Sequence, residues 1–168
     1  PLPGIDLYEG RGVHYYVSRR EDFRDKRIVI AGGGDSAVDW ALSLSEVARA
    51  VYFVHRRDKF RAAPESVDRL RRLATTGKVE LVVPYQLAGV DGANGQLTAV
   101  DVATLDGVVR RIEADALLPF FGFNYYFTFH DPVFTSIGLL DAVGNVIMLA
   151  LCYVGWKKCK AAETGADL

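Results

Sequence analysis

An alternation of short apolar runs and longer amphipathic segments covers much of the first 84 residues. Residues 27–31, 50–54 and 78–84 are short, largely apolar and rich in β-branched side chains, which predicts strands buried on both faces of a parallel sheet. Residues 35–48 and 64–77 repeat their apolar positions at helical spacing. The predicted order is therefore β-α-β-α-β, and right-handed crossovers would place three parallel strands side by side.

A different pattern follows in the next part of the chain. Residues 96–104 and 108–113 alternate apolar and polar positions and are joined by a short turn at 105–107, which is typical of antiparallel hairpin strands. The polar, glycine-rich residues 91–95 precede them as a predicted turn. A last buried parallel strand is predicted at 115–120. The fold class is therefore α/β with an antiparallel insertion.

The turn between the first predicted strand and helix is rich in glycine. Its small residues Gly32, Gly34 and Ala37 have the spacing G-x-G-x-x-A, which predicts a dinucleotide site. The first allows a tight turn, the second lets a pyrophosphate approach the backbone, and the third lets the helix pack closely on the strand. Asp35 or Ser36 would begin the helix, whose N–H groups favour an anion, and Ser36 could add a hydroxyl donor. These five residues form the predicted pyrophosphate site, although the motif alone also fits a plain tight connection.

Three arginines follow the second predicted strand. They are Arg56, Arg57 and Arg61, and His55 stands directly before them. At this position an acidic residue would bind the ribose 2′-hydroxyl of NAD(H), whereas arginine accommodates the 2′-phosphate of NADP(H). Because guanidinium groups match phosphate oxygens bidentately and stay charged, the cluster predicts NADPH as the cofactor. The alternative is a solvated basic loop that leads into a helix.

Two motifs, GGGDSAVDWAL at residues 32–42 and HRRDKFRA at residues 55–62, resemble the NADPH-binding domain of thioredoxin-reductase-like flavoproteins. The resemblance covers residues 1–123, including a lead-in segment at 2–15 that is similar to the crossover from an FAD domain. It implies a Rossmann-like parallel sheet, of the kind found in flavoproteins with two dinucleotide-binding domains, with an inserted antiparallel β-meander. Residues 16–19 lack the C-x-x-C dithiol of thioredoxin reductases, so the chain most resembles the ferredoxin (flavodoxin)–NADP reductase branch.

This resemblance implies a function and a set of partners. The implied reaction passes hydride from NADPH to FAD and electrons on to ferredoxin or flavodoxin, and the cofactors carry the chemistry. FAD would belong to a domain outside this chain, because the chain has a single glycine fingerprint. The resemblance also places His55 at the adenosine end of NADPH and Gly122 beside the nicotinamide, with a simple strand-end turn as the alternative for Gly122. No catalytic side chain is predicted.

Two other functions stay open. A non-catalytic NADP(H)-binding or interaction module would keep both motifs without the flavin half. An enzyme of the same kind could instead reduce a peroxiredoxin-type or quinone partner. In either case residues 1–122 are the predicted NADPH-binding domain, and residues 123–168 are a tail that is either a degraded return to an FAD domain or an interface segment. A homodimer is also compatible with the sequence.

Composition and a few single residues disfavour several other classes of function. The 168 residues are 50% hydrophobic with a formal net charge of −1, which indicates a globular domain and disfavours nucleic-acid binding. Cys152 and Cys159 match no disulfide framework or metal-ligand spacing, which favours a reducing, cytoplasmic setting and no metal site. Asp141 and Asn145 disfavour a membrane anchor in the apolar tail. The start at Pro1, without methionine, indicates a fragment of a longer protein.

Overall fold

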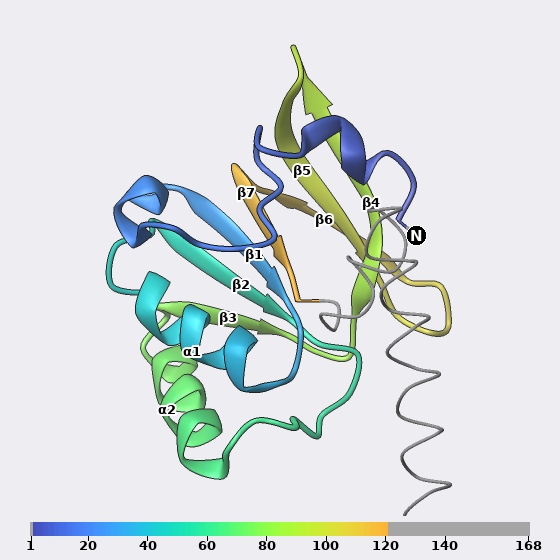
Figure 1. Ribbon diagram of the computed structural model, residues 1–168. Helices are drawn as coiled ribbons and strands as arrows, with labels where there is room; N and C mark the ends of the chain where they lie inside the picture. Colours follow the sequence, from blue (N-terminus) through green and yellow to red (C-terminus); the bar gives the residue numbers. More distant parts are fainter. Residues whose placement is uncertain (1, 121–168) are drawn as a thin grey trace, which may run out of the picture. The chain divides into compact units, whose positions relative to one another are not determined.

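The computed structural model describes residues 2–120, which form two β-sheets, two α-helices and two 3-10 helices. Four strands make a parallel sheet in the order β3 (Val79–Val82), β2 (Ala50–Val54), β1 (Arg27–Ala31) and β7 (Ala116–Pro119) (Figure 1). Two helices connect these strands and pack on one face of the sheet, namely α1 (Asp35–Leu44) and α2 (Pro64–Thr75). The predicted Rossmann-like sheet is confirmed.

The strand β1 shows why these strands are apolar at successive positions. Ile28 and Ile30 belong to the core that the helices cover, whereas Val29 and Ala31 belong to a second core on the opposite face of the sheet. All four side chains are 6% exposed or less. Because successive side chains of a strand point to opposite faces, a sheet that is covered on both sides requires apolar residues at every position.

The second core is closed by a three-stranded antiparallel sheet in the order β4 (Gln86–Ala93), β5 (Gln96–Ala103) and β6 (Val109–Glu113). The prediction of a turn over residues 91–95 is wrong, because β4 includes the first three of these residues. Asn94 and Gly95 alone make the turn, with φ of 54° and 76°. A Cβ at Gly92 would overlap the backbone of Gln96 and the ring of Tyr8, so no side chain fits at this position of β4.

The N-terminal segment joins the two sheets. It contains the 3-10 helix η1 (Ile5–Tyr8) and a turn that follows it between the bridge residues Glu9 and Val13. The N–H of Leu97 in β5 donates to the carbonyl of Arg11 at 3.0 Å, and the N–H of Leu117 in β7 donates to the carbonyl of Gly12 at 2.7 Å. The segment that resembles a crossover between domains is therefore hydrogen-bonded to both sheets.

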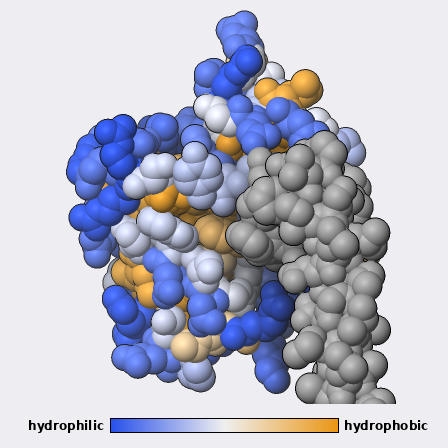
Figure 2. Space-filling model, in the orientation of Figure 1, coloured by the Kyte–Doolittle hydropathy of each residue, from blue (hydrophilic) through white to orange (hydrophobic). Residues whose placement is uncertain are grey.

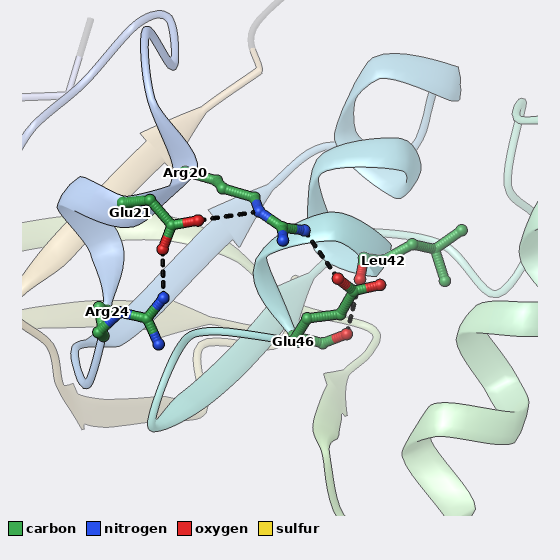
Figure 3. A network of polar contacts seen from close by, with 6 residues as sticks. Arg20, Glu21, Arg24, Leu42 and Glu46 are labelled. Carbon is green, nitrogen blue, oxygen red and sulfur yellow. Dashed lines mark hydrogen bonds and ion pairs between the residues drawn. The ribbon is translucent and has the colours of Figure 1, made fainter.

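Polar contacts surround the C-terminal end of α1 (Figure 3). The Ser45 hydroxyl donates to the carbonyl of Leu42 at 2.7 Å, and the helix ends here, earlier than predicted. Arg20, from the 3-10 helix η2 (Arg20–Phe23), forms a 2.7 Å ion pair with Glu46. Such exposed ion pairs contribute about 0–1 kcal/mol each, so the network orients this end of the domain without dominating its stability.

The surface of the described residues carries little continuous hydrophobic area on the face that Figure 2 shows. Hydrophilic residues cover most of this face, and the hydrophobic ones form small separate patches. No helix within residues 2–120 has the length and hydrophobicity that a membrane span requires. The predictions for Gly122, for the cysteines and for the tail at 123–168 fall outside the described residues.

An ion pair joins the beginnings of β1 and β7. Asp115 accepts hydrogen bonds from three groups of Arg27, namely Nη2 at 2.8 Å, Nε at 3.1 Å and the backbone N–H at 2.8 Å. The N–H of Asp115 donates to the carbonyl of Arg27 at 2.9 Å. The hydrogen bonds from the Arg27 side chain lower the pKa of the Asp115 carboxyl, and partial burial opposes them only in part.

Asp115→Asn is expected to lower the free energy of unfolding by about 1 kcal/mol at neutral pH, a modest value because the carboxylate is 39% exposed. The folded-state pKa lies below that of the unfolded chain, so the carboxylate stabilises the fold fully above about pH 4 and loses this effect as the pH falls through the folded-state pKa. Urea unfolding of both proteins at about pH 7 and about pH 3 should show a deficit that shrinks at the lower pH.

The matched control is Asp68→Asn, at a surface contact of 3.8 Å with Arg71. This variant is expected to unfold like the wild type at both pH values. An equal deficit in the control, or an Asp115→Asn deficit that does not change with pH, would contradict the assignment.

Candidate functional site

The glycine turn, residues 32–34, connects β1 to α1 at the carboxyl end of the parallel sheet (Figure 1). The N–H of Gly32 donates to the carbonyl of Val54 at the end of β2, at 3.1 Å. The N–H of Phe120 donates to the carbonyl of Ala31 at 2.8 Å. The turn therefore lies between the ends of β2 and β7, the edge at which open parallel sheets bind their ligands.

The first two glycines are enclosed by neighbouring residues. A Cβ at Gly32 would lie 2.7 Å from the Cβ of Ala37 and 2.9 Å from the Cβ of Phe120, closer than atoms pack in proteins. A Cβ at Gly33 would overlap the imidazole ring of His55. Ala37 is 1% exposed, so the helix packs closely against the turn at Gly32.

Gly34 stands in a different environment. A Cβ at this position would meet no atom within 4 Å, and its φ of −99° and ψ of 177° are extended backbone that any residue adopts. No side chain caps the start of α1, and Ser36 is exposed in its first turn. Because the first N–H groups of a helix point out of its N-terminal end, this open space fits a ligand with negatively charged oxygens.

The arginine loop, residues 55–63, runs from the end of β2 to the start of α2. Arg56, Arg57 and Arg61 are exposed, and none of them forms an ion pair or a side-chain hydrogen bond within residues 2–120. Arg27 in β1, by contrast, is paired with carboxylates. Three guanidinium groups in one short loop are therefore unpaired among the described residues, an arrangement that suits the binding of an anion.

The arginine loop is fastened to the glycine turn by its backbone. The N–H groups of Arg61 and Ala62 donate to the carbonyl of Gly33 at 2.7 and 3.2 Å. The next N–H, that of Ala63, donates to Oδ1 of Asp35 at 2.7 Å. The structure therefore brings together the two motifs that the sequence separates by some twenty residues.

His55 packs inside the arginine loop. Its ring lies over Gly33 and stacks on Phe60 at a centroid distance of 5.2 Å, and Nε2 is 3.3 Å from the carbonyl of Lys59. Burial lowers the pKa of His55, and the three arginines lower it further, although the contact with the Lys59 carbonyl opposes them. Neutral imidazole is therefore favoured, with Nε2–H as the donor to Lys59.

Two contacts of this site have no signal that sequence patterns could show. The bond from Ala63 to Asp35 depends on the path of a loop, and the Phe60 ring that supports His55 reads in the sequence as an ordinary aromatic residue. The predicted binding role of Gly122 lies outside the described residues. Within residues 2–120, no group of three or more His, Cys, Asp or Glu residues could coordinate a metal ion.

Residues 27–107 match the protein-family model described as pyridine nucleotide-disulphide oxidoreductase. A ferredoxin–NADP reductase from Paramagnetospirillum magneticum is 65% identical over 124 residues, which are 74% of this chain and 37% of that protein. One of the same name from Granulibacter bethesdensis is 62% identical over 125 residues, 74% of this chain and 36% of that protein.

The chain thus spans little more than a third of the curated relatives that it matches. Among solved structures, the thioredoxin reductase of Lactococcus lactis is similar to it with a TM-score of 0.65 and 29% identity, over 72% of this chain and 40% of that chain. The chain is therefore similar in sequence to ferredoxin–NADP reductases and similar in fold to a thioredoxin reductase. The predicted resemblance to thioredoxin-reductase-like flavoproteins is confirmed.

The glycines of the turn are expected to differ in what they contribute to stability. Gly32→Ala should lower the free energy of unfolding by about 1–3 kcal/mol, because its methyl group would overpack the contact between Ala37 and Phe120. Gly34→Ala adds a methyl group in open space and should lower it by a smaller amount, because only the weaker preference of alanine for the N-cap of α1 opposes the change. Urea unfolding of the two variants measures the difference, and equal losses would contradict it.

Proposed function

We propose that this chain contributes the NADPH-binding part of a ferredoxin–NADP reductase. One observation carries the proposal: the arginine loop is hydrogen-bonded to the glycine turn, next to the free space at Gly34 where α1 begins. The names of two relatives, at 65% and 62% identity, support it. The proposal concerns the whole enzyme, of which this chain covers a part.

The two phosphate regions of NADPH would meet different parts of the site. The pyrophosphate fits the open space at Gly34, where the first turn of α1 and the Ser36 hydroxyl supply hydrogen-bond donors. The 2′-phosphate fits the guanidinium groups of Arg56, Arg57 and Arg61. Gly32, Asp35, Ala37 and His55 shape the site through the packing and hydrogen bonds described above.

The chemistry that the bound cofactors supply is hydride transfer from NADPH to FAD, with FAD in a domain outside this chain, and electron delivery to ferredoxin or flavodoxin. The residues of this chain bind and orient NADPH. We assign no acid, base or nucleophile role to any residue between 2 and 120, since such a transfer needs position more than proton movement.

Arg56→Ala and Arg61→Ala are each expected to weaken the binding of NADP⁺ by about 1–3 kcal/mol, because each removes a charge-assisted hydrogen bond to the 2′-phosphate. NAD⁺ lacks this phosphate, so its affinity should change little. Arg56→Glu should go further and move the preference towards NAD⁺. Calorimetric titration of the full chain with each nucleotide measures both affinities.

Arg69→Ala is the control, because Arg69 is an exposed arginine of α2 outside the arginine loop. It should bind both nucleotides as the wild type does. If the loop variants keep the wild-type preference for NADP⁺, the 2′-phosphate is bound elsewhere.

The division of cofactors between domains gives an expectation for activity. The full chain should support NADPH-dependent reduction of a dye when it is mixed with a separately supplied FAD domain of such a reductase. It should not do so alone, because the FAD that accepts the hydride would belong to the other domain. Absorbance of the dye follows the reaction. Tight NADP⁺ binding without dye reduction in the mixture would favour a non-catalytic NADP(H)-binding module.

A further inference from the structure

Asp35 carries a negative charge at the place where the proposed site would receive phosphates. It is the first residue of α1 and follows Gly34, whose surroundings are open. A carboxylate in contact with a pyrophosphate would repel it. In the structure its Oδ1 instead accepts a hydrogen bond from the N–H of Ala63, 28 positions further along the chain.

This hydrogen bond joins the starts of two helices. Ala63 directly precedes Pro64, the first residue of α2, and proline has no N–H, so the Ala63 amide is the last donor of the arginine loop. The two preceding amides, of Arg61 and Ala62, donate to the carbonyl of Gly33. Three successive N–H groups therefore bond to the glycine turn and to the residue that follows it.

The Asp35 contact adds a third hydrogen bond at the end of the arginine loop, two residues after Arg61. With this bond present, the loop end that carries Arg61 is held on the glycine turn before any ligand arrives, so binding a phosphate requires less ordering of this part of the loop. Without it, the loop end would keep its two bonds to Gly33 and lose the third. Binding a ligand would then have to order this part of the loop, and the lost conformational entropy would weaken the affinity.

We propose that Asp35 is a positioning residue that sets the preference for a 2′-phosphorylated dinucleotide, by bonding the end of the arginine loop to the start of α1. The inference rests on the proposed NADP(H) function. His55, which stacks on Phe60 and contacts the Lys59 carbonyl, supports the middle of the same loop from within. Asp35 acts through the loop and needs no contact with the cofactor.

The affinity ratio of NADP⁺ to NAD⁺ tests this role. Asp35→Ala is expected to lower the ratio about three- to tenfold in calorimetric titrations of the full chain, the effect of one lost hydrogen bond. Asp35→Asn should keep the wild-type ratio, because the amide oxygen accepts the same bond. A direct repulsion between Asp35 and the pyrophosphate would act on both nucleotides alike and leave the ratio unchanged in either variant.

Hydrogen exchange of the nucleotide-free chain provides a second readout. The amides of Arg61 and Ala63 should exchange faster in Asp35→Ala than in the wild type, and Asp35→Asn should restore their protection. Asp39→Ala, one turn further along the exposed side of α1, is the matched control and should change neither readout. If Asp35→Ala does not fold, Asp35→Ser takes its place, since serine suits a helix start but its side chain is one bond shorter.

The outcomes separate this inference from the proposed function. A wild-type chain that binds both nucleotides equally overturns the proposed function and this inference with it. A wild-type preference for NADP⁺ that survives the loss of the Asp35 carboxylate overturns this inference alone. So does an Asp35→Asn ratio as low as that of Asp35→Ala.

Discussion

The burial of the parallel sheet on both faces is the constraint on which the rest of this structure depends. Neighbouring residues of β1 face different cores, so this strand turns neither side to water. Helices cover one face, and the antiparallel sheet with the N-terminal segment covers the other. The loops at the carboxyl edge of the strands form the candidate site.

The site is built mainly from backbone. The glycine turn is hydrogen-bonded to the end of β2, passes beside the residue that follows β7, and receives two amides of the arginine loop. These bonds use main-chain groups and leave the guanidinium groups of the loop unpaired within residues 2–120. A hydrogen-bonded backbone that carries unpaired charged side chains favours selective binding of an anion, since the backbone is already ordered when the ligand arrives and less entropy is lost on binding.

Sequence patterns were sufficient where a feature depends on local periodicity or on a motif of fixed spacing. The strands at 27–31 and 50–54, the start of α1 and the place of the arginines agree with the structure. Sequence patterns fail where residues outside a short window determine the local structure. Asp91 and Gly92 favour a turn locally, yet both pair with residues of β5 and belong to β4. The bond from Ala63 to Asp35 likewise follows from the route of a whole loop, which no short window contains.

The three successive glycines of the turn look alike in the sequence but are required for different reasons. The first two are required by the protein itself, because Ala37, Phe120 and His55 occupy the space that a side chain would need. The third meets no such obstacle. A descendant of this chain that no longer met a nucleotide would therefore be free to replace Gly34 while it retained Gly32 and Gly33, and drift at that single position would record the loss of the ligand.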